Sequence, residues 1–211
     1  GELLKKLDDL GIANNTIVDP GDYSGVLEEL RTLLKDGLYG INQISEIVVN
    51  LKNFSRLDRS KMATFNLNEG LASTLLLAKH ELKGHTVKKS FGDIPPVTCS
   101  PSQVNQVFLN LINNAIDEIG QGGTIEIRTA LENKKLVAEF ADNGHGIKPE
   151  NLKRIFDPFF TTKEPGKGTG LGLYISYDIV KKLGGSISVA NRDGGGAIFT
   201  IVLPVITLDS R

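Results

Sequence analysis

The sequence has little cysteine, almost no net charge and no long apolar run, and each shortage excludes a class of protein. Its 211 residues contain a single cysteine, Cys99, which excludes a disulfide framework and a multi-cysteine metal cluster and fits a reducing compartment. Lys and Arg number 24 against 25 Asp and Glu, so the net charge of -1 provides no overall field to attract nucleic acid or an anionic membrane. The longest apolar stretches, such as Leu75–Ala78, are far shorter than the roughly 20 residues that cross a bilayer.

The beginning of the chain carries no secretory signal, and its first residue is Gly1 rather than Met. The chain also opens in a segment that is already patterned as a helix. We therefore interpret the sequence as a fragment of a longer protein. We expect this fragment to be cytoplasmic, to have no membrane segment and to bind no nucleic acid.

The first sixty residues are patterned as helix. Apolar residues recur at alternating steps of three and four around Gly37, as in the seam of a coiled coil, and predict one long helix from Asp22 to Arg59. A second apolar stripe in Glu2–Leu10, followed by a loop at 11–21, predicts a helix that turns back to pack antiparallel. Two helices still leave apolar surface exposed. The stripe length favours a four-helix bundle formed by two chains over a hairpin that lies on the rest of the protein.

From about residue 63 the pattern changes to alternating strands and helices, so we expect two domains, residues 1–62 and 63–211. The second domain is α+β: a two-layer α/β sandwich with helices on one face of a mixed sheet. Asn66, with Glu69 three residues later, caps the first of its helices. The expected helices are Asn66–Lys83, Ser102–Ile119 and Gly170–Leu183, and the expected strands are Thr86–Phe91, Val97–Cys99, Thr124–Ala130, Leu136–Asp142, Ser186–Ala190 and Ala197–Leu203.

Four segments of this second domain have residue types that core packing does not explain. The first is a polar strip on the long helix, where Gln106, Asn110, Asn114 and Asp117 share one face. Amide oxygens suit Mg²⁺, a cation that prefers hard oxygen ligands and keeps several waters when it is shared with phosphate. A solvent-exposed polar face is the alternative, although such a face usually carries Lys and Glu.

The second segment, Asp142-Asn-Gly144-His-Gly146, directly follows an expected strand. A carboxylate at a strand end can accept a hydrogen bond from an exocyclic amine, and the two glycines let the backbone approach a flat ligand closely. A turn with one acidic residue explains the same letters equally well.

The third and fourth segments are neighbours in the chain. Phe156-Asp-Pro-Phe-Phe160-Thr161-Thr162-Lys163 predicts a loop that aromatic side chains anchor and that places Lys163 over an anion, or else a surface apolar patch. Gly166–Leu173 runs straight into a helix, and its glycines expose backbone N–H groups before the helix N-terminus, which is an anion site. This segment has neither the spacing of a P-loop nor the strand and acidic residue of a dinucleotide fingerprint.

Taken in this order, the four segments resemble the N, G1, F and G2 motifs of the GHKL ATP-binding superfamily, and the chain is similar to its sensor histidine kinase branch. The resemblance covers roughly residues 37–204, and four ordered motifs are far more specific than any one of them. The runs QVFLNL, FDPFFTTK and GKGTGLGLYIS look most like the nitrogen- and dicarboxylate-sensing subgroup. The fold that the resemblance implies is the Bergerat-type ATP-binding fold, preceded by part of the dimerisation and phosphotransfer hairpin.

The resemblance also implies roles for the matching residues. Asn114 coordinates Mg²⁺, and Asn110 and Lys163 are the catalytic residues beside the phosphates. Asp142 receives the adenine amino group, and the loop 148–168 closes over ATP as a lid. The implied nucleotide-binding residues are Asn110, Asn114, Asp117, Asp142, Gly144, Gly146, Ile147, Thr162, Lys167, Gly168, Thr169, Gly170, Leu171 and Gly172.

The chain departs from the family pattern in two places. The phosphoacceptor, a His followed by an acidic residue and soon by a Pro, is absent: His145 lies in the adenine loop, and we expect His80 and His85 to be ordinary surface residues. Many relatives carry a Lys toward the phosphates where this chain has Asp117. We expect Lys163 or Lys167 to supply that charge instead.

The resemblance therefore implies an ATP-dependent histidine kinase of a two-component system. The fragment should bind Mg²⁺-ATP and present the γ-phosphoryl to a His on a helix upstream of Gly1 in the same homodimer, but it should not phosphorylate itself. The phosphoryl would then pass to an aspartate of a response regulator. An upstream sensor region could anchor the whole protein to a membrane.

Three other functions share parts of the pattern. A gyrase-type ATPase clamp holds a water-activating Glu where this chain has Asn110, so a general base for water is missing here. A second alternative is a nucleotide-binding module without catalysis, such as a degenerate kinase, and the intact set of Asn114, Asp142 and glycines argues against it. An anti-sigma Ser/Thr kinase would not need the helix from Asp22 to Arg59.

Overall fold

The computed structural model describes residues 23–56, 61–164 and 168–205. The chain divides into two compact units, residues 1–47 and 48–211, and each is described by itself. The expected helix at Glu2–Leu10 and the loop that follows it lie outside the described residues, as do Asp22 and residues 57–60.

Helix α2 (Tyr23–Arg56) is the long helix that the apolar stripe predicts. Three side chains of that stripe, Leu34, Ile41 and Ile44, leave 64%, 63% and 64% of their surface exposed. At the positions described, the stripe is therefore present and uncovered in the single chain. Of the helices in the described residues, none is both long and apolar enough to cross a membrane.

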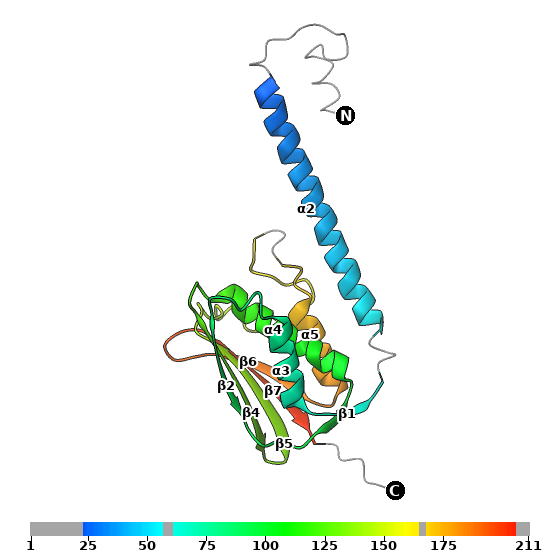
Figure 1. The fold of residues 1–211 in the computed structure, drawn as a ribbon, viewed down its shortest axis with the longest axis vertical. Helices are drawn as coiled ribbons and strands as arrows, with labels where there is room; N and C mark the ends of the chain where they lie inside the picture. The colour runs from blue at the N-terminus through cyan, green and yellow to red at the C-terminus, as the bar shows by residue number, and fades with distance from the viewer. Residues whose placement is uncertain (1–22, 57–60, 165–167, 206–211) are drawn as a thin grey trace. The chain divides into compact units, whose positions relative to one another are not determined.

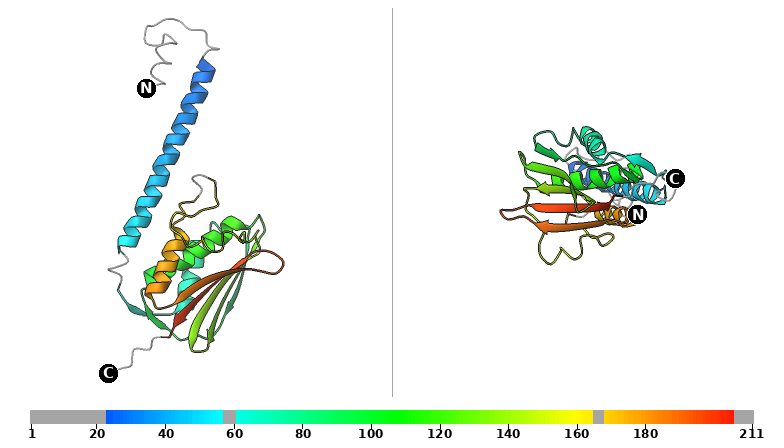
Figure 2. Two further views of the ribbon diagram at one scale, coloured as in Figure 1. Left: turned by 180° about the vertical axis from the view of Figure 1, so that it is seen from behind. Right: turned by 90° about the horizontal axis from the view of Figure 1, so that it is seen from below.

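A five-stranded mixed sheet forms one layer of the second unit (Figures 1 and 2). Strand β2 lies parallel to β4, and the pairs β4–β5, β5–β7 and β7–β6 are antiparallel. A separate two-stranded sheet pairs β1 with β3, and the sequence analysis missed β1. The strands are β1 (Ala63–Phe65), β2 (Thr86–Phe91), β3 (Val97–Cys99), β4 (Thr124–Glu132), β5 (Lys135–Asp142), β6 (Ser186–Asn191) and β7 (Ala197–Pro204).

Helices α3 (Leu67–Leu77), α4 (Pro101–Glu118) and α5 (Gly172–Lys182) form the second layer and cover one face of the sheet (Figure 2). Two of them begin at a side-chain cap, and the cap of α3 is the expected one. Asn66 Oδ1 accepts from the backbone N–H groups of Asn68 and Glu69, at 3.0 and 3.3 Å. Ser100 caps α4 and is followed by Pro101, which needs no N–H partner in the first turn. The expected two-layer α+β fold is confirmed.

Two expected helix bounds are wrong. Helix α3 ends at Leu77 rather than Lys83, because the chain tightens into turns after Ala78, with Lys83 N–H bonded to the His80 carbonyl at 3.2 Å. Helix α5 begins at Gly172 rather than Gly170. Gly170 has φ +67 and its carbonyl oxygen accepts from Phe159 N–H at 3.0 Å, so it belongs to the preceding loop.

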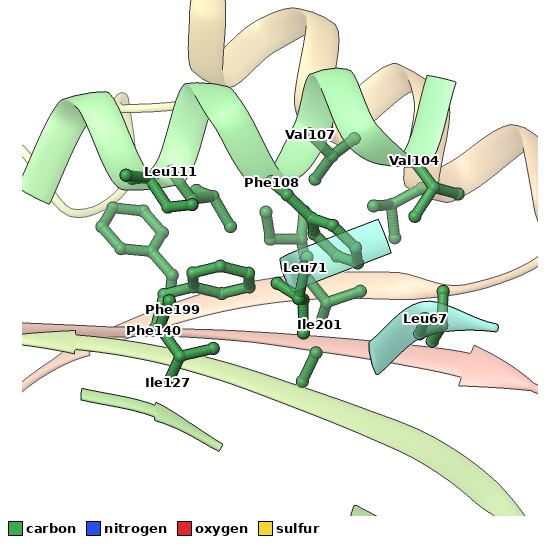
Figure 3. Close-up of a cluster of buried hydrophobic side chains, with 14 of the residues drawn as sticks. Leu67, Leu71, Val104, Val107, Phe108, Leu111, Ile127, Phe140, Phe199 and Ile201 are labelled. Atoms are coloured by element: carbon green, nitrogen blue, oxygen red, sulfur yellow. The ribbon is translucent and has the colours of Figure 1, made fainter. Parts of the chain in front are cut away.

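The core lies between the two layers and fixes the position of α4 (Figure 3). The rings of Phe108 on α4 and Phe140 on β5 lie 5.7 Å apart between centroids, and both side chains are 1% exposed. The helix buries Val104, Val107, Leu111 and Ile112 on the same side. Since the apolar side of α4 is committed to the core, its amide side faces the other way, where the candidate site lies.

The reactivity of the Cys99 thiol reports on the packing of this core. Its side chain is 2% exposed, and burial raises the pKa of the thiol to about 11, from an ordinary value of 9.0. We expect a maleimide or iodoacetamide to leave the native chain unlabelled near pH 8 and to label it in concentrated urea. Because the native pKa lies above the unfolded one, this thiol makes the free energy of unfolding fall as the pH rises from 9 towards 11. A native thiol that reacts as fast as the denatured one would contradict the packing described.

Candidate nucleotide-binding site

The candidate site gathers at the end of β5, on the amide side of α4 and at the beginning of α5. Asp142 is the last residue of β5, and its side chain is 3% exposed. Its Oδ1 accepts from the backbone N–H groups of Gly144 and Ala197, at 2.9 and 3.2 Å. Within the described residues Oδ2 has no hydrogen-bond partner. One oxygen therefore holds the carboxylate in place, and the other remains an acceptor for a ligand.

The loop after Asp142 lies against the end of α4. A Cβ on Gly144 would collide with the carbonyl oxygen of Glu118, so only glycine allows this approach. Asn143 holds the same loop to the sheet, because its Oδ1 accepts from Thr124 N–H at 2.7 Å. The close approach to α4 thus gives a structural reason for glycine at position 144.

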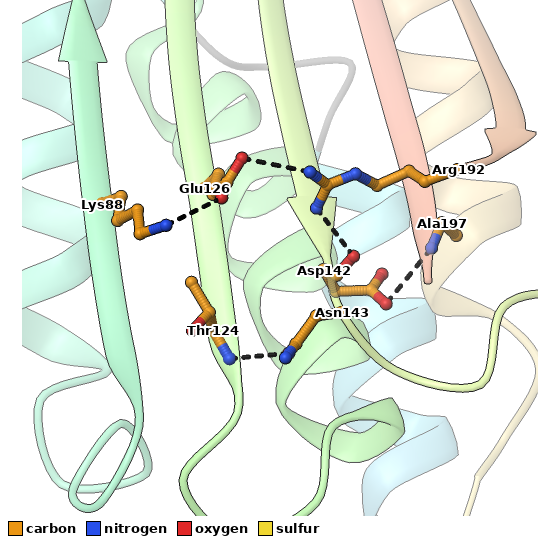
Figure 4. A network of polar contacts seen from close by, with 7 residues as sticks. All are labelled: Lys88, Thr124, Glu126, Asp142, Asn143, Arg192 and Ala197. Carbon is orange, nitrogen blue, oxygen red and sulfur yellow. Dashed lines mark hydrogen bonds and ion pairs between the residues drawn. The ribbon is translucent and has the colours of Figure 1, made fainter. Parts of the chain in front are cut away.

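The sequence analysis missed two residues that contact this loop, Asn191 at the end of β6 and Arg192 in the β6–β7 turn. Asn191 Oδ1 accepts from Ile147 N–H at 2.8 Å, and its Nδ2 donates to the Ile147 carbonyl oxygen at 2.7 Å. Arg192 Nη1 donates to the carbonyl oxygen of Asp142 at 3.0 Å (Figure 4). No local pattern could have found them, because the partners lie 44 and 50 residues away in sequence.

On α4, Asn110 and Asn114 behave differently. Asn110 Nδ2 donates to the Gly172 carbonyl oxygen at 3.0 Å and to Ser176 Oγ at 3.2 Å, so this amide joins α4 to the first turn of α5. Asn114 lies one turn further along and is half-buried, and its side-chain amide has no hydrogen-bond partner among the described residues. Its amide oxygen is available to a ligand.

The structure brings Lys163 to the same end of α4. Its Nζ pairs with Asp117 Oδ2, and the two side chains are 26% and 50% exposed. An ion pair this exposed contributes only about 0.2–1 kcal/mol, so it places the lysine rather than stabilising the fold. The other candidate cation, Lys167, lies outside the described residues.

The loop that carries Lys163 is anchored by two of its three phenylalanines. The Phe156 ring lies 5.5 Å from that of Tyr177, and the Arg154 guanidinium lies 4.6 Å from the centre of the Phe160 ring. Phe159 is 65% exposed and has φ 65, a left-handed conformation that is rare for a bulky residue. The sequence analysis left two interpretations of this segment open, an anchored loop and a surface apolar patch. The structure has features of both, because Phe156 and Phe160 are anchored and Phe159 is exposed.

At the start of α5, Leu171 provides no side-chain cap, so the first N–H groups of the helix have no side-chain partner there. Gly168 lies beside the loop, with a Cβ position 3.0 Å from Lys163 Cδ and from Thr161 Oγ1. Three groups that can bind phosphate therefore lie near one end of α4. They are the uncapped N–H groups at the start of α5, the Lys163 ammonium and the free amide of Asn114.

The donor set fits Mg²⁺ held jointly by protein and phosphate. The described residues contain no group of three or more His, Cys, Asp or Glu that could hold a metal ion. Mg²⁺ shared with phosphate needs only one or two protein oxygens and keeps several waters. The free amide of Asn114 matches that requirement, and Asp117 follows it by one turn.

Comparisons with known proteins identify the family to which the chain belongs. Residues 99–207 match the family described as histidine kinase-, DNA gyrase B- and HSP90-like ATPase. The chain therefore belongs to this family, and the domain is a sensor histidine kinase catalytic domain with the ATP-binding fold of that family.

Two curated relatives illustrate the similarity. Sporulation kinase E of Bacillus subtilis is 44% identical over 114 residues, which are 54% of this chain and 15% of that protein. Sensor histidine kinase ZraS of Salmonella typhimurium is 34% identical over 169 residues, which are 78% of this chain and 36% of that protein. The chain thus spans a minor part of the length of either relative.

Two solved structures of histidine kinase ThkA have the same fold as this chain. The catalytic domain of histidine kinase ThkA aligns with a TM-score of 0.63 and 31% identity, over 69% of this chain and 98% of that one. ThkA in complex with response regulator protein TrrA aligns with a TM-score of 0.66 and 22% identity, over 97% of this chain and 57% of that one.

Gly196 provides a test of how the site is built. It has φ +87, and a Cβ there would collide with the carbonyl oxygen of Asp142. We expect Gly196→Ala to lower the free energy of unfolding and the affinity for ATP together, because the end of β5 must move. Gly122→Ala is the matched control, since Gly122 has φ +81 and no atom within 4 Å of a Cβ. That control should show only the backbone strain of about 1–2 kcal/mol, measured by urea unfolding. Equal effects of the two variants would contradict the close packing at Asp142.

Proposed function

We propose that this domain binds Mg²⁺-ATP in the site described and is the kinase part of a two-component sensor. The observation that carries the proposal is the Asp142 carboxylate, which is buried and has one oxygen held by two N–H groups and the other left as an acceptor. A purine amino group can satisfy such an oxygen by donating a hydrogen bond to it.

The residues on α4 and in the loop would act on the phosphate end. Asn114 Oδ1 would coordinate Mg²⁺, which neutralises phosphate charge when it is bound. Lys163 would add a second positive charge where negative charge builds up during phosphoryl transfer. Asn110 would hold the start of α5 in place through its bonds to Gly172 and Ser176. The remaining implied contacts, at Gly144, Gly146, Ile147, Thr162, Lys167, Gly168, Thr169, Gly170, Leu171 and Gly172, belong to the same proposal.

A kinase is favoured over an ATPase clamp by the chemistry at Asn110. A clamp of the gyrase type needs a carboxylate at this position to activate water, whereas an amide is no base. The Asn110 amide nitrogen is moreover engaged with two oxygen atoms of α5. The position therefore has a structural use that does not involve water.

The partners of the domain are proposed from α2 and from the relatives. The exposed apolar side chains of α2 suit a second copy of the chain, so we assign residues 1–62 to a dimerisation and phosphotransfer hairpin and 63–211 to the catalytic domain. The complex of ThkA with TrrA supports a response regulator as the acceptor of the phosphoryl group. The FDPFFTTK and GKGTGLGLYIS runs support the nitrogen- and dicarboxylate-sensing subgroup.

The proposal predicts phosphoryl transfer onto a histidine that this chain does not carry. The test mixes this chain with γ-labelled Mg²⁺-ATP and a longer chain that includes the upstream helix and has its own site disabled by Asn114→Ala. We expect acid-labile, alkali-stable label on the longer chain. The longer chain alone is the control and should remain unlabelled.

One result would contradict the proposal, and a second would remove its support from transfer between chains. Label on the short chain itself would show a phosphoacceptor among its own residues. An absence of label, despite tight nucleotide binding and formed heterodimers, would favour either transfer within one chain or a module without catalysis.

A further inference from the structure

Residues 191–197 comprise the turn between β6 and β7 with one strand residue on each side, and are called the β6–β7 turn below. This segment holds the loop 142–147 at both of its ends. At one end, the Asn191 amide makes two hydrogen bonds with the backbone of Ile147, one as acceptor and one as donor. At the other end, Arg192 donates to the Asp142 carbonyl oxygen, and Ala197 N–H donates to Asp142 Oδ1. Residues 191–197 therefore supply four hydrogen bonds to a loop that is remote in sequence.

The guanidinium of Arg192 is oriented by a second partner. Its Nη2 lies 3.2 Å from Glu126 Oε2, and Lys88 Nζ lies 3.2 Å from Oε1 of the same carboxylate (Figure 4). The planar guanidinium thus bridges the Glu126 side chain on β4 and the backbone carbonyl of Asp142 at the end of β5. Lysine has no such fork and could not serve both partners in this way.

These contacts hold the Asp142 carboxylate in place from outside its own loop. The bond from Gly144 N–H to Oδ1 comes from the loop itself and moves with it. The contacts from Asn191, Arg192 and Ala197 come from the β6–β7 turn and resist such movement. The direction in which Oδ2 points therefore depends on this turn.

We propose that Asn191 and Arg192 are positioning residues for base selection, an inference that rests on the proposed binding of ATP. Adenine presents an amino group to Oδ2, whereas guanine presents a carbonyl oxygen at the corresponding position, which a carboxylate repels. This discrimination requires that Oδ2 neither turns away nor retreats. The β6–β7 turn prevents both movements by fixing Asp142 and Ile147.

The test measures the affinity of the whole chain for ATP and for GTP, by competition against a fluorescent ATP analogue. The variants are Asn191→Leu and Arg192→Met, which keep side-chain size and remove the hydrogen bonds. We expect the ratio of ATP affinity to GTP affinity to fall by about tenfold in each. Partial unfolding lowers both affinities by the same factor and leaves the ratio unchanged, so the ratio reports on positioning alone.

Arg128→Met is the matched control. Arg128 also lies on the sheet and pairs with two carboxylates, Glu132 and Glu139, but among the described residues it makes no hydrogen bond or ion pair with the loop. Its ratio should equal that of the native chain. Arg192→Lys provides a milder variant that keeps the charge, and its ratio should still fall.

The outcomes separate the two proposals. In one outcome, the native chain selects ATP while none of the Asn191 and Arg192 variants changes the ratio of ATP affinity to GTP affinity. That result would overturn the positioning role and leave the proposed function intact. A native chain that binds both nucleotides equally would overturn base selection. A native chain that binds neither would contradict the proposed function itself.

Discussion

A buried carboxylate at the end of β5 is the constraint on which the rest of the site depends. Removing a charged group from water costs several kcal/mol unless hydrogen bonds replace its hydration. At Asp142 the backbone N–H groups of Gly144 and Ala197 provide two such bonds to one oxygen. They require a tight loop after β5 and a β7 that begins directly beside it, which explains the crowded glycines at 144 and 196.

Helix α4 connects this carboxylate to the hydrophobic core. One side of the helix packs Phe108 against Phe140 of β5, the strand that ends in Asp142. The other side presents Asn110 and Asn114. Core packing and site geometry therefore share one rigid element, so that displacing the helix changes the distance between the proposed base-binding end and the proposed phosphate-binding end of the site.

The sequence predicted the parts of the structure that have local causes. The cap at Asn66 and the alternation in Thr124–Ala130 and Leu136–Asp142 are local, and the corresponding elements formed, as did the two-layer α+β fold. The roles of Asn191 and Arg192 could not be predicted, because their partners lie 44 and 50 residues away. Helix α3 also ended earlier than its propensity suggested, because the chain tightens into turns after Ala78.

The most direct test of the central claim compares ATP with purine riboside triphosphate, which lacks the 6-amino group, on the native chain and on Asp142→Asn. Asparagine keeps an oxygen for the N–H groups of Gly144 and Ala197 but replaces the free acceptor by a donor. A hydrogen bond to a charged group is worth roughly 1.5–3 kcal/mol, so the native chain should prefer ATP by about tenfold to a hundredfold. The variant should lose that preference. Equal affinities in the native chain, or an unchanged preference in the variant, would contradict the assignment of Asp142 to the adenine amino group.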